Sequence, residues 1–244
     1  MNGFSHNFIT KNSFADNQEL LYGAVQPDID ECEDAFSHHF YNPVTLKDFY
    51  GSDDTAKNRS IWHFCEFLIT GSFEQLGRSL HFLEDICTPV HTQYEDSFDA
   101  VYRLKLHTNF EKKLDSYISD GSFKRSMCFE FIPSFVGLIN HCALVSSSLY
   151  DDIKDQDEFS DYFLSNTLNL ASDSVENVSK LILLNSLKAK KIDCVNVLIE
   201  GDSIIPSTSD SNIIARADSH RNVFVFKRNG KLSNFHLIDK FSIE

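Results

Sequence analysis

Two pairs of a histidine and a carboxylate, each pair four residues apart, constrain this chain more than any other feature. His81 precedes Asp85, and His107 precedes Glu111. On a helix, this spacing places both side chains of a pair on one face, close enough to share a metal ion. His91 adds a third imidazole soon after the first pair, just past a proline. The sequence therefore predicts helices whose ligand-bearing faces meet at a metal site, with more than one metal.

The composition indicates a mainly helical body around that site. The chain has 244 residues, is 42% hydrophobic and contains 22 phenylalanines, but only 9 glycines and 5 prolines. Many large apolar residues with few helix breakers favour helices, and this length can bury a large core.

Apolar residues recur at helical spacing in several segments. Ser72 and Gln75 form the pattern of a capping box at the start of one of them. Between the first and second of these segments, residues 25–54 are irregular, and a loop of that length in a compact domain is usually functional or disordered. We expect helices over residues 6–24, 55–70, 72–87, 104–119, 124–151 and 157–188.

The C-terminal part of the chain has a different pattern. Residues 195–199 and 223–226 are short runs rich in valine, isoleucine and phenylalanine, which are typical of strands. We predict a helical domain over residues 1–191 and a small β-rich extension of about four strands over residues 192–244.

Charge and cysteine usage limit the partners and the compartment. The formal net charge is −14 without a long basic stretch, so we expect no stable nucleic-acid partner. Bound divalent cations could still hold a phosphate substrate. The six cysteines include no CxxC pair, which suits reduced thiols. We find no signal-peptide pattern and no apolar run of about 18 residues, so we expect no transmembrane segment. We expect a cytoplasmic protein, or one exported without a cleaved signal peptide.

The ligand spacing is similar to that of a known family. His81 to Glu111 follows the order His-x3-Asp-x5-His and then His-x3-Glu, and residues 77–91 and 107–111 resemble the bacterial zinc-dependent phospholipase C family. Fungal-type single-strand nucleases belong to the same superfamily. The resemblance covers residues 5–115 by motif and residues 116–188 by helical texture only, and it does not extend to the β-rich region.

Further positions match once these motifs are aligned. Residues 36–43 resemble the family segment that has a metal histidine, which points to His39 rather than His38. Asp28 stands where the family keeps a catalytic aspartate, with Asp30 as a competitor for that role. His6 stands at the position of the family's first histidine.

The resemblance implies a phospholipase C-like helical bundle with a three-zinc cluster. It assigns Asp28 the role of orienting or deprotonating the attacking water, and it places Phe36 in the substrate pocket. The implied ligands are Asp28, His39, His81 and Asp85 for one zinc, His91, His107 and Glu111 for a second, and His6 with the bridging Asp85 for a third.

The chain departs from the family at two places. The secreted phospholipases bind the third zinc through the amine and carbonyl of an N-terminal tryptophan, and no tryptophan precedes His6 here. Met1 is five residues from His6, so its amine would need a different local path, and we expect two or three Zn²⁺ ions with the third site the weakest. Ile29 stands where the choline pocket has a tyrosine, so choline selectivity does not carry over.

We therefore expect a zinc-dependent phosphodiesterase that hydrolyses phospholipid head-group phosphoesters, or other phosphodiesters, in peripheral contact with a membrane. One alternative is a single-strand nuclease or 3′-nucleotidase, although that branch generally ends its ligand set with aspartate where this chain has Glu111. Another is a non-catalytic, zinc-stabilised interaction module, although structural zinc sites are often rich in cysteine and this ligand set has none.

Overall fold

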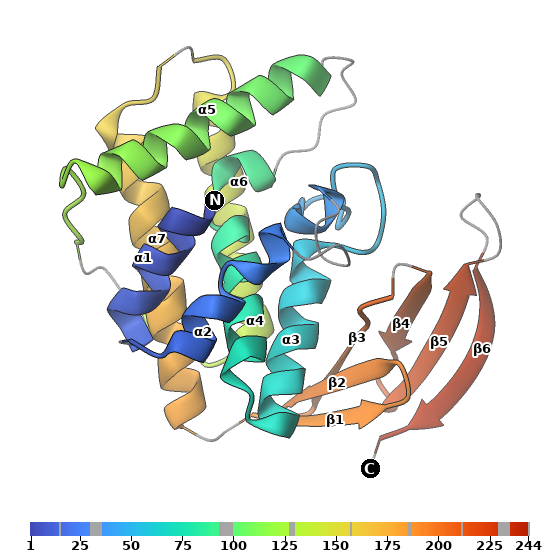
Figure 1. Cartoon of the computed structure of the whole chain (residues 1–244). Helices are drawn as coiled ribbons and strands as arrows, with labels where there is room; N and C mark the ends of the chain where they lie inside the picture. The colour runs from blue at the N-terminus through green and yellow to red at the C-terminus, as the bar shows by residue number, and fades with distance from the viewer. Residues whose placement is uncertain are drawn as a thin grey trace.

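The chain folds into a helical body followed by two small antiparallel sheets (Figure 1). The computed structural model describes residues 1–14, 16–29, 36–92, 100–126, 130–156, 158–184, 187–210, 212–228 and 235–243. The mainly α fold with a C-terminal β appendage, predicted from the sequence, is confirmed.

The helical body contains long helices joined by segments that include short 3₁₀ turns. Among the described helices, none combines the length and the hydrophobicity that crossing a bilayer requires. In chain order the elements are α1 (Gly3–Phe14), α2 (Gln18–Gly23), η1 (Gln26–Asp28), η2 (Phe36–His39), α3 (Ala56–Thr70), α4 (Phe73–Ile86), η3 (Pro89–His91), α5 (Ala100–Ser119), α6 (Phe135–Ile153) and α7 (Asp161–Leu183).

Local capping explains where these helices differ from the predicted ranges. The single helix expected over residues 6–24 is two helices, because the Asn17 side chain accepts a hydrogen bond from the Leu20 amide and starts α2. α6 begins at residue 135 rather than 124, because Ser134 caps it by accepting from the Gly137 amide at 2.9 Å. The predicted cap at Ser72 is present at the start of α4.

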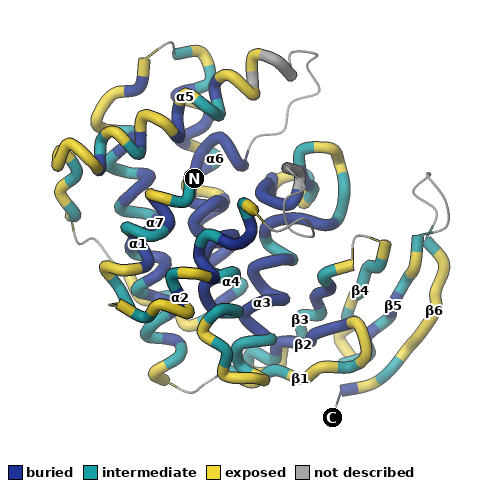
Figure 2. Tube along the Cα trace, viewed as in Figure 1, coloured by how far each residue is buried: buried dark blue, intermediate teal, exposed yellow. Residues whose placement is uncertain are grey.

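α4 runs through the middle of the body and is buried from Leu76 to its end, except at Arg78 (Figure 2). Leu76, Leu80 and Leu83 on this helix are fully buried in the main core. Each such side chain contributes roughly 1.5–3 kcal/mol through burial of apolar surface. The rings of Phe64 on α3 and Phe135 on α6 stack at 4.0 Å in the same core. The helix that carries His81 and Asp85 is thus firmly held in the fold.

Two glycines allow the backbones of α2 and α4 to touch. A Cβ atom on Gly77 would lie 2.2 Å from the Leu20 carbonyl oxygen, and one on Gly23 would lie 2.2 Å from the Glu74 carbonyl oxygen. Because glycine has only a hydrogen atom as its side chain, the two backbones can come this close at both positions. The Ala24 carbonyl, just after α2, then lies within 2.9 Å of the Nδ1 atom of the α4 histidine, His81.

The C-terminal strands form two three-stranded sheets with consecutive antiparallel pairing. Six strands are described where the sequence pattern indicates about four, and the first begins at residue 188. They are β1 (Lys188–Ile192), β2 (Val195–Glu200), β3 (Ser203–Ser207), β4 (Ile213–Ala217), β5 (Asn222–Arg228) and β6 (Phe235–Ser242).

The first sheet is attached to the helical body by both apolar and polar contacts. Leu198 on β2 is part of the main core. Glu200, at the end of the same strand, accepts hydrogen bonds from the Phe135 and Val136 amides and from the Ser134 hydroxyl at the start of α6. A carboxylate at a helix N-terminus satisfies free amides and interacts favourably with the helix dipole. The sheet therefore helps to fix α6.

We predict that Gly77→Ala lowers the free energy of unfolding by at least about 2 kcal/mol, because the new methyl group must push α2 away from α4. Chemical denaturation measures this change. Gly137→Ala is the comparison and should cost less, since its Cβ would lie 3.1 Å from the Ser134 side chain, a milder contact than 2.2 Å from a backbone carbonyl oxygen. Equal stability of Gly77→Ala and the wild type would show that the two helices do not depend on this contact.

Candidate metal centre

Three groups of histidine and acidic side chains lie within the helical body with their ligand atoms close together. In each group the nitrogen and oxygen atoms lie within 4.8 Å of one another, the separation expected of ligands that share one ion. Among the residues that the structure describes, the groups are His6 with Asp28 and His81, His39 with His81 and Asp85, and His91 with His107 and Glu111.

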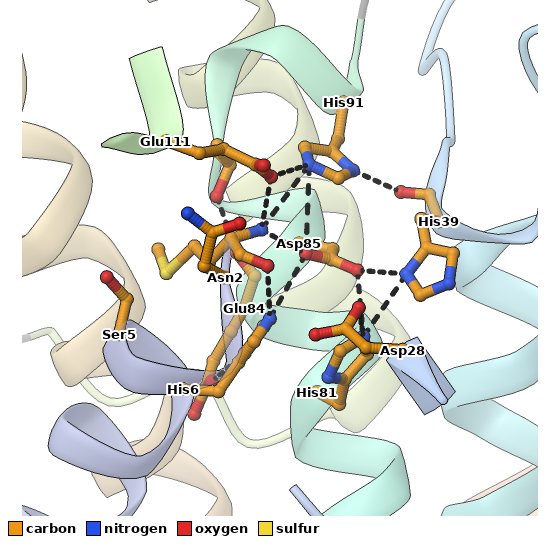
Figure 3. A network of polar contacts seen from close by, with 12 residues as sticks. Asn2, Ser5, His6, Asp28, His39, His81, Glu84, Asp85, His91 and Glu111 are labelled. Atoms are coloured by element: carbon orange, nitrogen blue, oxygen red, sulfur yellow. Dashed lines mark hydrogen bonds and ion pairs between the residues drawn. The ribbon is translucent and has the colours of Figure 1, made fainter. Parts of the chain in front are cut away.

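Asp85 lies at the centre of the cluster and is fully buried (Figure 3). It is in the last turn of α4, one turn after His81, and its two oxygens face different groups. The Oδ2 atom lies 2.7 Å from His39 Nδ1 and 3.3 Å from His81 Nε2. The Oδ1 atom lies 3.4 Å from His6 Nε2 and 3.8 Å from His91 Nε2. One carboxylate thus connects all the groups.

Backbone carbonyls orient two of the imidazoles. His81 donates from Nδ1 to the Ala24 carbonyl at 2.9 Å, and His91 donates from Nδ1 to the His39 carbonyl at 2.8 Å. Because Nδ1 carries the proton in both rings, the Nε2 lone pair is the one that faces the cluster. Metal-binding histidines are commonly fixed in this way.

Glu84 performs the same task for His6, a role that the sequence pattern did not reveal. It is fully buried, its Oε2 atom lies 2.5 Å from His6 Nδ1, and its Oε1 atom accepts from the Thr10 hydroxyl at 2.8 Å. The His6 Nε2 atom then points toward Asp85. The sequence shows that Glu84 precedes the predicted ligand Asp85 on the same helix, but it does not show which residue the Glu84 side chain contacts.

In two places, a pair of imidazole nitrogens lies close enough for both atoms to bind one cation. His81 Nε2 lies 3.1 Å from His39 Nδ1, and His107 Nε2 lies 3.1 Å from His91 Nε2. Since the Nδ1 atoms of His81 and His91 bear the protons, their Nε2 atoms present lone pairs to these neighbours. Imidazole and carboxylate donors converging in this way fit zinc. The donor set therefore suits the metal that the sequence predicts.

The group of His91, His107 and Glu111 is built between η3 and α5. Glu111 Oε1 lies 3.0 Å from His91 Nε2 and 3.3 Å from His107 Nε2. The buried ring of Phe40 stacks on the imidazoles of His91 and His107, with centroid distances of 4.9 and 5.8 Å. Phe40 thereby fixes both rings from one side.

Burial and neighbouring charge set the protonation of these ligands. Burial lowers the pKa of His81 to about 4 and that of His107 to about 3, and the neighbouring imidazoles act in the same direction. Burial alone would raise the pKa of Asp85, but the Met1 amine and the surrounding histidines outweigh it and hold the pKa well below the usual range. Neutral imidazole and ionised carboxylate are the forms that bind metal, so His81, His107 and Asp85 already have those forms.

His6 and His39 differ from these ligands. Burial would lower the pKa of each, but hydrogen bonds to the neighbouring carboxylates outweigh it, raising the pKa of His6 to about 10 and that of His39 above its usual value. Metal binding there must therefore release a proton.

The Met1 backbone lies inside the cluster, and its amine reaches the ligands, an outcome that the sequence left open. The amine nitrogen lies 2.5 Å from Asp85 Oδ1, 3.0 Å from Glu111 Oε1 and 3.4 Å from His91 Nε2. The Met1 carbonyl oxygen lies 3.0 Å from His6 Nε2. α1 begins at residue 3 and the preceding backbone turns inward, so Met1 occupies this place without a tryptophan.

The structure distinguishes His39 from its neighbour. His39 faces Asp85, whereas His38 lies with Nε2 3.2 Å from Asp54, a buried carboxylate that also pairs with Arg59. This arrangement gives His38 a role in an ion-pair network and leaves His39 for the metal.

Three further positions from the sequence have different outcomes. Asp28 is one-third exposed at the edge of the cluster, with Oδ1 3.5 Å from His81 Nε2. Asp30 and the Phe36 side chain lie outside the described residues, so their predicted roles stay predictions.

All eight metal ligands predicted from the sequence thus lie at one place. One grouping differs from the prediction, because His6 gathers with Asp28 and His81 as well as near Asp85. The difference arises because α1 and η1 pack against the same side of α4.

The cluster borders a cavity of about 330 Å³, and a larger cavity of about 540 Å³ against α6 and α7 has none of the metal ligands in its lining. The smaller cavity is therefore the one where a substrate would meet the metal ligands. It is lined by Met1, Asn2, Asp28, His39, His91, His107 and Glu111.

Comparison with known proteins finds similarity in sequence and in fold. A phospholipase C of Paraclostridium bifermentans is 30% identical over 117 residues, covering 41% of this chain and 29% of that protein. The chain superposes on the alpha toxin of Clostridium absonum with a TM-score of 0.53, at 13% identity and over 99% of this chain and 88% of that one. No family model matches the chain.

The chain resembles bacterial phospholipase C in sequence and in fold. A second solved structure, the Clostridium perfringens alpha-toxin from an avian strain, gives a TM-score of 0.52 at 15% identity, over 92% of this chain and 85% of that one. At these identities the structural likeness establishes the fold alone. The match to the curated phospholipase C spans less than a third of that protein.

We predict that Glu84→Gln weakens zinc binding by about 10- to 100-fold, because His6 loses the carboxylate that fixes its ring. Competition with a chelator measures the change. Glu74→Gln is the matched control on the same helix, since Glu74 lies at the surface and pairs with Arg78. Equal zinc affinity of the Glu84 variant and the wild type would contradict the orienting role.

Proposed function

We propose that the protein is a zinc-dependent phosphodiesterase of the phospholipase C kind, which hydrolyses phospholipid head-group phosphoesters. The observation that supports this most strongly is the convergence of the three ligand groups on one buried carboxylate beside a cavity. The similarity to bacterial phospholipase C supports the choice of lipid phosphoesters as substrates.

The proposed ligands follow the geometry of the cluster. His39, His81, Asp85 and Asp28 would hold one ion, and His91, His107 and Glu111 a second. His6, with Asp85 bridging and the Met1 amine and carbonyl close by, would hold a third. Bound zinc supplies Lewis acidity that makes water a nucleophile near neutral pH and neutralises phosphate charge.

The protein side chains would prepare the reaction in three ways. Asp28, which is one-third exposed and lines the cavity, would accept a proton from the attacking water as a general base. Asp85 keeps its negative charge in the interior and so holds the ligand groups together. The hydrogen bonds from His81 and His91 to backbone carbonyls keep both rings aimed at the cluster, so little reorganisation is needed.

The donor set favours catalysis over a structural role for the metal. The three described groups contain histidine, aspartate and glutamate only. Members of each group border the cavity, namely Asp28, His39, His91, His107 and Glu111. Structural zinc sites are closed and usually four-coordinate, whereas catalytic sites keep a position open for water. This arrangement supports a hydrolase rather than an interaction module.

We predict that Asp85→Asn lowers diesterase activity at least about 100-fold and removes bound zinc, because one carboxylate serves more than one ligand group. Metal analysis of the purified variant and turnover of a soluble phosphodiester measure both effects. Asp152→Asn, an exposed change in the last turn of α6, is the control and should match the wild type. A variant with full metal content and a tenth or more of the wild-type activity would contradict this role.

A substrate panel tests the proposed activity itself. The zinc-loaded protein should cleave phosphatidylcholine or phosphatidylinositol faster than single-stranded DNA or 3′-nucleotides, because the net charge of −14 repels nucleic acid. Head-group release and nucleotide release are measured at equal protein concentration. Faster cleavage of single-stranded DNA would favour the nuclease alternative, and an inert, fully zinc-loaded protein would favour the interaction module.

A further inference from the structure

One loop next to the metal centre displays large apolar side chains to solvent. It runs over residues 42–52, directly after the segment that carries His39, and we call it the apolar loop. Val44, Leu46 and Tyr50 are 81%, 59% and 72% exposed. Single exposed apolar residues are common, but three on one short loop at a proposed active site mark an interaction surface.

The backbone of the apolar loop is held in place rather than loosely extended. The Asn42 side chain accepts from the amides of Val44 and Thr45, and the Asp48 side chain accepts from the amides of Tyr50 and Ser52. Backbone hydrogen bonds, from residue 42 to the carbonyl of residue 47 and from residue 48 to the carbonyl of residue 52, close the two turns. The exposed side chains are therefore presented by an ordered scaffold.

The backbone conformation of Leu46 is energetically unfavourable. Its φ angle is +60°, in the left-handed region that a branched apolar residue rarely adopts. With more than half of the side chain exposed, burial within the chain does little to offset that cost.

The residues at the start of the apolar loop are hydrogen-bonded to the segment that carries His91. The Asn42 side chain donates to the Thr92 carbonyl, and the amide of residue 41 donates to the His91 carbonyl. The ring of Phe49 packs at 5.2 Å from that of Phe40, which also stacks on the imidazoles of His91 and His107. A surface held by the loop would therefore lie at a fixed position relative to the metal ligands.

The charges on the loop indicate which surface it fits. Lys47, the cation of the loop, pairs with Asp53, so its charge is already compensated and is not available to attract anionic lipids or nucleic acid. The apolar residues are too few to supply the roughly 800 Å² that one partner buries in a standard protein interface. Insertion of apolar side chains into the head-group boundary of a membrane gains free energy from the apolar area that is buried, so a loop without a free positive charge fits a zwitterionic surface better than an anionic one.

We propose that the apolar loop docks the protein on a zwitterionic phospholipid surface by inserting Val44, Leu46 and Tyr50. This inference rests on the proposed function, since docking would bring lipid head groups to the cavity lined by Asp28 and His39. Ile29, which follows Asp28 and is 68% exposed, adds a further apolar side chain near that cavity.

The test compares a double variant, Val44→Ser with Leu46→Asn, against the wild-type protein. Asparagine tolerates the left-handed conformation, so the variant should fold normally. Binding to phosphatidylcholine vesicles, measured by flotation, should fall roughly tenfold or more, because two inserted side chains are lost. Hydrolysis of bis(p-nitrophenyl) phosphate, a soluble diester, should stay at the wild-type rate, since neither residue lines the cavity.

Matched controls separate docking from folding and from catalysis. Leu183→Asn with Leu184→Ser removes two exposed leucines, 78% and 60% exposed, from the end of α7 and should leave vesicle binding unchanged. Tyr50→Ser provides a second loop variant that does not alter the left-handed position. Docking by the loop is supported only if the loop variants lose vesicle binding and the α7 variant keeps it.

Two results would overturn the inference. One is wild-type binding of vesicles by the loop variants, and the other is no vesicle binding by the wild type. In the first case, a change from dimer to monomer in the loop variants would assign the loop to self-association instead. Failure of the zinc-loaded wild type to hydrolyse the soluble diester would contradict the proposed function, not the docking loop.

Discussion

The buried carboxylate of Asp85 is the constraint on which the rest of the structure depends. A charged group removed from water costs on the order of several kcal/mol unless cations or hydrogen bonds compensate it. Here the compensation comes from imidazoles on separate elements and from the Met1 amine. The fold therefore brings remote segments to one point in the interior, which is useful when a metal centre is assembled there.

Packing and polar contacts have different tasks in building that centre. The apolar face of α4 fixes the helix in the core, and the close contact at Gly77 sets the carbonyl that orients His81. Glu84, one residue before Asp85, turns toward His6 on α1. Consecutive carboxylates on one helix thus act differently, the first by orienting a ligand and the second by joining the ligand groups.

The helical pattern and the ligand spacing were predictable from sequence, because both depend on local periodicity. Spacing by four residues was enough to pair His81 with Asp85 and to identify the second pair on α5. The role of Glu84 and the grouping of His6 with Asp28 were not predictable, since they depend on how α1, η1 and α4 pack. The break between α1 and α2 was also missed, because apolar periodicity continues across it.

Anomalous X-ray scattering at the zinc absorption edge, from crystals grown with zinc, tests the proposed metal centre most directly. We expect at least two strong peaks within coordination distance of the ligands, one beside Asp85 and His81 and one beside His107 and Glu111. Their separation should suit two metals that act on one phosphate, about 3.5–4 Å. Crystals in which these side chains bond only to one another, with no anomalous peak among them, would contradict the proposal.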